Sequence, residues 1–388
     1  MYTNNSNKKK ILFVIKTLEF GGGAEKVLMT VADKLSTYHD TSILTFRETN
    51  REYSTQVSRL NLGEKNTSRN FLVNFLKCFS RARKIKNISQ DNKIDIVIAA
   101  MKEANFPSLL SSLIFFNRAR IVIWIHNDPQ IEYGFFSKLV AKILYPFASN
   151  MVFLTKESSL FFKNDLKTII IPNPIPIDEI KRLTSEQIDN PFEKAILESG
   201  NILMNVGRLV PQKNHLLLLE IFHKVSELDP NTKLIILGQG PLKKDIEKKI
   251  KQLNLEDRVF LFGLKNNIFK YLIHAKLFIL TSSFEGFSNV ILEAMALGIP
   301  VISNDCSAGP SEILGNTAKH LHTEDKFLLD QFGIRIPSDN FQEFVKAIIF
   351  MLTHADIMKK YEDLSRTRAK DFDIEKIIPQ WRALIDLI

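Results

Sequence analysis

Short apolar runs alternate with segments of helical periodicity along almost the whole chain. In the first half, the apolar runs predict strands at 11–15, 41–46, 94–100, 121–125, 150–155 and 168–171, and the periodic segments predict helices at 25–35, 70–87, 105–116 and 133–148. The second half repeats the pattern, with strands expected at 201–206, 233–237, 259–262, 277–281 and 300–303, and helices at 215–228, 242–253, 267–275, 289–297, 341–353 and 357–372. Strands that alternate with helices form parallel sheets covered by helices, so we expect two α/β domains.

A cluster of prolines separates the two halves. Pro172, Pro174 and Pro176 interrupt the alternation and mark a domain boundary, with an N-terminal domain at 1–175 and a second domain at 176–372. The length of 388 residues also favours two domains. No apolar run approaches the ~20 residues of a transmembrane helix. The basic cluster and short apolar run at the start favour a first strand over a signal peptide, because no small-residue cleavage site follows.

The sequence SSFEGFSNVILE at 282–293 joins a predicted strand to a predicted helix. Glu285 falls in the loop, and Glu293 falls about two turns into a helix that is expected to start near Ser288. The free N–H groups at the start of such a helix favour phosphate. Carboxylates in these two places can reach opposite ends of a molecule about 10 Å long. The spacing therefore predicts a nucleotide-sugar site, with the sugar at Glu285, the ribose at Glu293 and the diphosphate between them.

Other candidate residues follow other predicted strands, at the sheet edge where ligands bind in α/β domains. Arg208 and Lys213 follow the strand at 201–206 and together can neutralise a diphosphate, although two solvated loop cations would explain them as well. Gly238 begins the sequence GQGP after the strand at 233–237. It either lets the backbone approach a nucleotide or only turns the chain.

Three further candidates lie in the first half. Gly22 and Gly23 belong to a run of three glycines after the first strand, which leaves helix N–H groups open to an anion, although a tight turn is an equal explanation. His126 follows the strand at 121–125 and can donate to a sugar hydroxyl or stabilise charge near neutral pH, although a lone loop histidine is more often structural. Asn173, between two prolines, can contact ligand from the boundary or simply form a turn.

The net positive charge of the chain comes from its first half. Residues 1–190 carry 27 Lys/Arg and 18 Asp/Glu, whereas residues 191–388 carry 25 of each. The helix at 70–87 is amphipathic and basic, as a membrane-surface helix would be, and a core-packed helix with a solvated cationic face fits equally well. We therefore expect the first half to face a polyanion or an anionic membrane. Cys78 and Cys306 fall in different halves, so a reducing cytoplasm fits better than a disulfide framework.

Together these motifs resemble glycosyltransferase family 4, a retaining family with the GT-B fold of two Rossmann-like domains facing across a cleft. The resemblance covers nearly the whole chain. It rests on GGGAEK (21–26), IHN (125–127), IPNPI (171–175), VGRLVPQKN (206–214), LGQGP (237–241) and the Glu-x7-Glu motif within SSFEGFSNVILEAMALGIPVI (282–302). The segment NDCSAGPSEIL (304–314) is similar to the bacterial branch that builds surface polysaccharides and lipid-linked oligosaccharides.

The resemblance implies a role for each matching residue. It implies catalytic roles for Glu285, at the donor sugar, and for His126, at the transferred sugar. It implies that Asn173 acts at the hinge or the acceptor. The donor-binding residues that it implies are Gly22, Gly23, Arg208, Lys213, Gly238, Gly286, Phe287, Ser288, Asn289 and Glu293.

The family's mechanism is described as a front-side reaction in which the leaving phosphate deprotonates the acceptor, so Glu285 would position and stabilise charge rather than form a covalent bond. The resemblance implies no cofactor and no metal, because a helix N-terminus and two cations take the place of the metal. We accordingly expect no metal-binding Asp-x-Asp pair. The segment at 373–388 is expected to form a helix that packs back on the N-terminal domain.

These features predict a bacterial, metal-independent transferase that moves a hexose or N-acetylhexosamine from a UDP-sugar to a glycan on a polyprenyl diphosphate. We expect it in the cytoplasm, with its basic N-terminal domain on the anionic inner face of the cytoplasmic membrane, and we expect no nucleic-acid partner. A GT-B nucleotide-sugar 2-epimerase and a non-catalytic nucleotide-sugar-binding scaffold protein are the alternatives. The combination of Glu285, Glu293, Arg208 and Lys213 argues against both.

Overall fold

The computed structural model describes residues 8–64, 71–162, 167–306, 309–315, 320–322, 324, 326–338 and 340–388. The chain divides into two compact units. Unit 1 comprises Met1–Pro174 and Ile377–Ile388, and unit 2 comprises Ile175–Lys376, whereas the predicted divisions fall after residues 175 and 372. No helix among the described residues is both long enough and apolar enough to span a bilayer.

Unit 1 is built on a seven-stranded sheet in the order β3-β2-β1-β4-β5-β6-β7, in which every neighbouring pair is parallel. The strands are β1 (Lys10–Ile15), β2 (Asp40–Thr45), β3 (Ser58–Asn61), β4 (Ile96–Ala100), β5 (Arg120–Ile125), β6 (Asn150–Phe153) and β7 (Thr168–Ile170). The central strands β1 and β4 consist almost entirely of buried apolar residues, as strands covered on both faces must.

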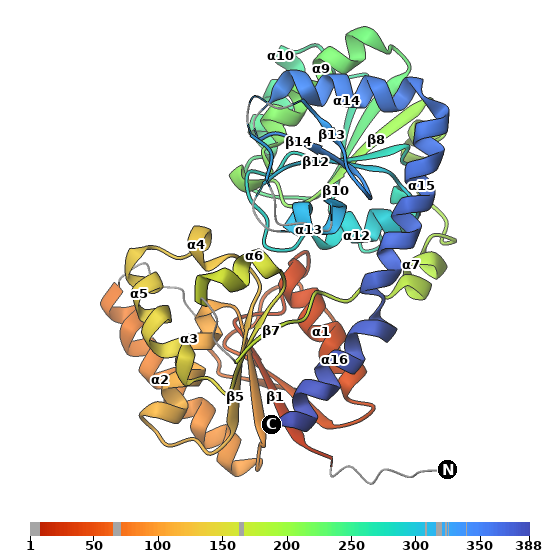
Figure 1. Cartoon of the computed structure of the whole chain (residues 1–388). Coiled ribbons are helices and arrows are strands. Elements are labelled where there is room, and N and C mark those ends of the chain that lie inside the picture. The colour runs from red at the N-terminus through yellow and green to blue at the C-terminus, as the bar shows by residue number, and fades with distance from the viewer. Residues whose placement is uncertain are drawn as a thin grey trace. The chain divides into compact units, whose positions relative to one another are not determined.

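Helices cover both faces of this sheet (Figure 1). They are α1 (Gly23–Leu35), α2 (Phe71–Asp91), α3 (Lys102–Leu113), α4 (Pro129–Glu132), α5 (Phe135–Leu144), η1 (Tyr145–Phe147), α6 (Lys156–Ser159), η2 (Leu160–Phe162) and the greater part of α16 (Ile374–Leu387). In Figure 1, α2, α3 and α5 lie on one side of the sheet, and α1 and α16 lie on the other. Trp381 of α16 is fully buried against Trp124 of β5, with ring centroids 4.6 Å apart.

Most predicted elements of unit 1 are present, although the single-turn segments α4, α6 and η2 were not predicted and the helix predicted at 105–116 lies at Lys102–Leu113. The strand β3 was missed, because Ser58–Asn61 is a short, largely exposed edge strand without an apolar run. The single helix predicted at 133–148 is divided into α5 and η1, with Pro146 inside the second segment. The helix predicted at 70–87 continues to Asp91, and its first residue, Asn70, lies outside the described residues.

Unit 2 repeats the architecture around a second seven-stranded sheet, in the order β10-β9-β8-β11-β12-β14-β13. Its strands are β8 (Asn201–Val206), β9 (Thr232–Leu237), β10 (Val259–Gly263), β11 (Leu277–Leu280), β12 (Val301–Asn304), β13 (Leu328–Leu329) and β14 (Ile334–Ile336). Only β13, at the edge, runs antiparallel to its neighbour among the described strands. Because β8 and β11 are adjacent and parallel, the loops that follow them emerge side by side.

The helices of unit 2 are α7 (Ile177–Leu183), α8 (Pro191–Leu197), η3 (Pro211–Lys213), α9 (His215–Leu228), α10 (Lys243–Gln252), α11 (Phe269–Leu272), α12 (Asn289–Ala296), α13 (Gly309–Gly315), α14 (Phe341–Thr353), α15 (Ala355–Ala369) and η4 (Lys370–Phe372). Phe222 of α9 and Phe344 of α14 pack into one apolar core with the strands. The bounds of β8, α9 and α14 are those predicted, whereas the helix predicted at 267–275 forms only the single turn of α11.

Candidate functional site

An ion pair lies at the carboxyl ends of two neighbouring strands of unit 2. Lys213 is in the segment after β8, Glu285 is in the loop after β11, and Lys213 Nζ is 2.5 Å from Glu285 Oε1. The two side chains are only 15% and 8% exposed. The structure therefore brings together two predicted site residues that are 72 positions apart in the sequence.

The backbones around this pair are tied to one another. Gln212 Nε2 donates to the Phe284 carbonyl at 2.8 Å, and the Ser283 N–H donates to the Gln212 carbonyl at 2.8 Å. Thr281 Oγ1 donates to the Lys213 carbonyl at 3.2 Å. These bonds hold the two loops in register, so the positions of Lys213 and Glu285 are fixed by backbone contacts as well as by their charges.

Glycines allow the loops after β8 and β9 to touch. Gly238 follows β9 with φ +150°, and a Cβ there would lie 1.8 Å from the Gly207 carbonyl oxygen. The Gly207 N–H donates to the Leu237 carbonyl at 2.9 Å. Gly238 therefore has a packing role against the segment that leads to Arg208, which is exposed at the surface of unit 2. Its predicted contact with the donor remains a prediction.

The loop that contains Glu285 leads into the N-terminus of α12. Gly286, Phe287 and Ser288 are buried, and Ser288 is the N-cap residue, although its side chain makes no capping hydrogen bond. The buried hydroxyls of Ser282 and Ser288 have no hydrogen-bond partner among the described residues. Uncapped helix N–H groups and unpartnered hydroxyls in one loop are groups that an anionic, polyhydroxylated ligand can satisfy.

Glu293 lies inside α12 and is buried, 7% exposed. The prediction that it stands two turns into the helix is wrong. The helix begins at Asn289, so Glu293 is its fifth residue, ~6 Å along the axis from the first. The helix ends at Ala296, one residue before the predicted end, and Gly298 follows with φ +78°, a conformation that favours glycine.

A buried ionic network lies at the carboxyl end of β12, and it was not predicted from the sequence. Arg335 Nη1 is 3.0 Å from Asp305 Oδ1, and Arg335 Nε is 2.6 Å from Asp330 Oδ2. Burial raises the pKa of Asp305, but its hydrogen bonds and the Arg335 charge outweigh burial, so the net shift is downward. A Cβ on Gly309, at the start of α13, would lie 2.9 Å from Phe287 Cα, so the segment after β12 packs directly against the loop before α12.

His126 lies in unit 1, directly after β5, and is almost fully buried, 6% exposed. Its ring packs on Trp124 with centroids 4.4 Å apart, and its Nε2 has no hydrogen-bond partner among the described residues. Burial lowers the pKa of His126 to about 3. The imidazole is therefore neutral near pH 7 and available as a hydrogen-bonding group, and its contact with a sugar remains a prediction.

The remaining predicted residues of unit 1 follow the strands β1 and β7. Gly22 is the N-cap of α1 and Gly23 is its first residue. A Cβ on Gly22 would lie 2.1 Å from the Glu25 carboxylate, so Glu25 folds back over this helix start. Asn173 follows β7 and is buried, 2% exposed. The strand β4 separates β1 from β5, so the glycines and His126 do not follow neighbouring strands.

One correction concerns acidic pairs. The sequence does contain an Asp-x-Asp arrangement, Asp371 and Asp373, contrary to the expectation of none. Asp371 pairs with Arg368 at 3.0 Å and with Lys376 at 3.6 Å. Among the described residues, no three His, Cys, Asp or Glu side chains are grouped in a way that could hold a metal ion.

Comparison with known proteins identifies the family. Residues 186–370 match the family described as glycosyl transferases group 1. The chain is also 32% identical over 416 residues to an uncharacterised glycosyltransferase of Methanocaldococcus jannaschii, in a match that covers 98% of this chain and 99% of the relative. This chain therefore belongs to the group 1 glycosyltransferases, and the resemblance to glycosyltransferase family 4 is confirmed.

Two further comparisons add a relative and a fold. The chain is 29% identical over 369 residues, covering 92% of this chain and 94% of the relative, to the Campylobacter jejuni N-acetylgalactosamine-N,N'-diacetylbacillosaminyl-diphospho-undecaprenol 4-alpha-N-acetylgalactosaminyltransferase. The crystal structure of Anabaena HepE in complex with UDP matches with a TM-score of 0.77 at 19% identity, over 98% of this chain and 100% of that one. The structural match confirms the predicted GT-B fold of two Rossmann-like domains.

Proposed function

We propose that this glycosyltransferase moves a hexose or an N-acetylhexosamine from a UDP-sugar to a glycan carried on a polyprenyl diphosphate, in the assembly of a bacterial polysaccharide. The ion pair of Lys213 and Glu285 beside the N-terminus of α12 carries the proposal. Two relatives support it. The Campylobacter enzyme acts, by its name, on a diphospho-undecaprenol substrate, and HepE was crystallised with UDP.

In this proposal the donor lies along the loops after β8 and β11. Lys213 and Arg208 neutralise the diphosphate, and the N–H groups at the start of α12 stabilise the charge that develops on the leaving phosphate. Glu293 accepts hydrogen bonds from the ribose. Glu285 accepts them from the sugar hydroxyls and favours positive charge at the anomeric carbon. In this arrangement the two carboxylates bind the sugar and the ribose of the donor, and the two cations bind its diphosphate.

The same proposal assigns donor-binding roles to Gly22, Gly23, Gly238 and the 286–289 segment. It places Asn173 at the hinge or the acceptor. His126 contributes a neutral imidazole that exchanges a hydrogen bond with a sugar hydroxyl, since burial keeps it unprotonated. Transfer proceeds with retention, and the leaving phosphate takes the proton of the acceptor hydroxyl. We further propose that transfer needs no divalent cation, because the lysine and arginine charges and the helix N-terminus balance the diphosphate.

The proposed place of action is the inner face of the cytoplasmic membrane, where a lipid-linked acceptor would be presented. The basic first half of the chain supports this location, since an anionic surface attracts it. Of the α2 cations, however, Arg81 already binds Glu64 through two hydrogen bonds of 2.8 and 2.6 Å. A membrane contact through α2 would therefore rest on its other lysines and arginines.

A donor screen tests the proposed function. The full chain would be incubated with UDP- and GDP-sugars, with and without extracted lipid-linked acceptor and with and without EDTA, and nucleoside diphosphate release would be measured. Release from one UDP-sugar, only with acceptor and unchanged by EDTA, is the expected result. The anomeric coupling constant of the product, measured by NMR, would establish retention or inversion.

Other outcomes would identify the alternatives. A free epimerised UDP-sugar formed without acceptor would identify a 2-epimerase. Absence of turnover, together with tight calorimetric binding of UDP, would identify a nucleotide-sugar-binding scaffold protein. Loss of activity with EDTA, restored by Mg²⁺ or Mn²⁺, would overturn the metal-independent mechanism and leave the transferase assignment intact.

A further inference from the structure

The helix α5 and the η1 turn that follows it expose an apolar face. Six large apolar side chains along them are between 40% and 78% exposed: Phe135, Phe136, Leu139, Val140, Ile143 and Phe147. We call these six residues the α5 face. A single exposed apolar residue is ordinary, but six contiguous ones, three of them phenylalanines, mark a surface that binds something apolar.

The spacing of these residues places them on one side of the helix. The five residues on α5 itself occupy positions i, i+1, i+4, i+5 and i+8, which fall within one arc at 100° per residue, and Phe147 follows in η1. The opposite side of α5 is anchored in unit 1, because Ala141 is fully buried and joins the same core as Tyr145 of η1. The fold therefore needs the inner side of α5 and leaves the α5 face without a packing role in unit 1.

Positive charge borders the α5 face. Lys138 and Lys142 lie on one flank of the arc, and residues 135–149 contain no Asp or Glu. Of the carboxylates just before the helix, Glu132 lies 3.8 Å from Lys102, and Asp128 caps α4, although its charge also interacts with that of Lys138.

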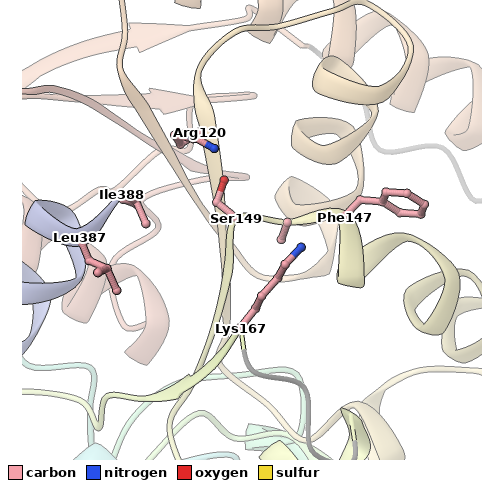
Figure 2. A pocket seen from close by; sticks show the side chains of 7 residues that line it. Arg120, Phe147, Ser149, Lys167, Leu387 and Ile388 are labelled. Carbon is pink, nitrogen blue, oxygen red and sulfur yellow. The ribbon is translucent and has the colours of Figure 1, made fainter.

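Two more cations lie at the far end of the face. Phe147 also lines a cavity of about 320 Å³, together with Arg120 and Lys167. Figure 2 shows the Phe147 ring directed away from the C-terminal residues that line the other side of this hollow. Lys167 Nζ donates to the Pro146 carbonyl at 2.9 Å, which holds this ammonium group beside the end of the face. Apolar side chains bordered by cations fit an anionic lipid surface, in which the apolar groups insert and the lysines reach the phosphates.

We propose that the α5 face inserts into the interfacial region of an anionic lipid bilayer and holds the enzyme on the membrane. The proposal concerns this surface alone and does not depend on the donor or acceptor. A second copy of the chain fits less well. A symmetric dimer through the same face would gather two copies each of Lys138 and Lys142, with no carboxylate from 135–149 to pair with them.

Vesicle binding of matched variants tests the proposal. The test variant is Phe135→Ser, Phe136→Ser, Leu139→Ser, and the control is Phe192→Ser, Leu216→Ser, Leu228→Ser, which removes exposed apolar residues from unit 2. Both would be floated with vesicles of phosphatidylglycerol and phosphatidylethanolamine and with neutral phosphatidylcholine vesicles. We expect at least a tenfold loss of binding to anionic vesicles for the test variant only, and about fivefold weaker binding for each of Lys138→Gln and Lys142→Gln. Equal binding of test and control variants would overturn the proposal.

A fluorescent probe measures insertion directly. Both native tryptophans, Trp124 and Trp381, are fully buried, so a Phe136→Trp substitution adds one reporter at the surface. Bilayer insertion predicts a blue shift with anionic vesicles and quenching by lipids brominated on their acyl chains. An unshifted, unquenched signal from the introduced tryptophan would refute insertion. Analytical sedimentation without lipid tests for a dimer interface instead. A dimeric wild type and a monomeric test variant that bind vesicles equally well would identify the α5 face as that interface. Circular dichroism spectra and melting temperatures equal to those of the wild type would show that each variant is folded.

Discussion

Replacing Glu285 by glutamine should separate the chemical step from donor binding. The substitution keeps the shape of the side chain and removes the charge that now pairs with Lys213 at 2.5 Å. If Glu285 stabilises charge at the anomeric carbon, transfer should fall by about 100- to 1000-fold, equivalent to about 2.7–4 kcal/mol. UDP should bind at least as tightly as to the wild type, because Lys213 no longer shares its charge with a carboxylate.

The same substitution has a calculable effect on folding. Removing one partner from a fully buried ion pair costs about 3–5 kcal/mol. The Lys213 side chain is 15% exposed and can recover part of its hydration, so we expect a loss of only about 1–2 kcal/mol. For a unit of about 200 residues this lowers the melting temperature by about 2–8 °C.

The assay is a comparison of three quantities for Glu285→Gln and Lys213→Met: the transfer rate, the calorimetric Kd for UDP and the melting temperature. Lys213→Met should show the opposite pattern in binding, with UDP affinity reduced by about 10- to 100-fold, since a charged hydrogen bond contributes about 1.5–3 kcal/mol. A Glu285→Gln variant that keeps a tenth of the wild-type rate would refute the charge-stabilising role of Glu285. Tenfold weaker UDP binding by that variant would refute it too, because Glu285 would then serve the diphosphate.

Three further predictions concern single residues. Gly238→Ala should destabilise unit 2 by about 2 kcal/mol or more in urea unfolding, because its Cβ would meet the Gly207 carbonyl, whereas Gly134→Ala, which meets nothing within 4 Å, should stay within about 0.5 kcal/mol. His126 has a pKa of about 3 in the folded state and 6.5 in the unfolded state, so it contributes no pH dependence above pH 6.5. Below pH 6.5 the unfolded state binds the proton more readily, so the free energy of unfolding falls by up to about 1.4 kcal/mol for each pH unit. Unfolding of wild type and His126→Phe at pH 7, 6 and 5 should therefore show a wild-type stability that falls relative to the variant as pH falls, and parallel curves would contradict this. Arg208→Ala, at an exposed position, should weaken UDP binding about tenfold and leave the melting temperature unchanged, and a fall in melting temperature would indicate a structural role instead.

The sequence predicted the parallel architecture well because the buried strands are nearly continuous apolar runs. The strand Asn201–Val206 and the helix His215–Leu228 have their predicted bounds. Prediction failed where elements are short or polar. Ser58–Asn61 pairs with one neighbour only and has no apolar run, and Ile177–Leu183 is a short helix just after the prolines. Local pattern carries little information about such elements, since long-range pairing and packing stabilise them.

The candidate site shows the same limit. Each of its loops could be found from its place after a strand, but the direct pairing of Lys213 with Glu285 depends on the neighbouring positions of β8 and β11, which sequence order does not reveal. The buried pair of Asp305 and Arg335 could not be foreseen either, because the two residues are 30 positions apart and Arg335 lies within an otherwise apolar strand. The apolar spacing of α5 was visible in the sequence, but only the structure shows that it faces outward.

The path of the chain through unit 1 has a consequence for its biosynthesis. Unit 2 is inserted between Pro174 and Ile377, and Trp381, from beyond the insertion, is fully buried against Trp124. As the ribosome extends the chain, the first 174 residues emerge long before the segment that closes this part of their core. The Trp124 surface of nascent unit 1 therefore stays uncovered while the whole of unit 2 is translated. Expression of residues 1–174 alone should yield an aggregation-prone product, and fusing 377–388 to its end through a flexible linker should restore solubility.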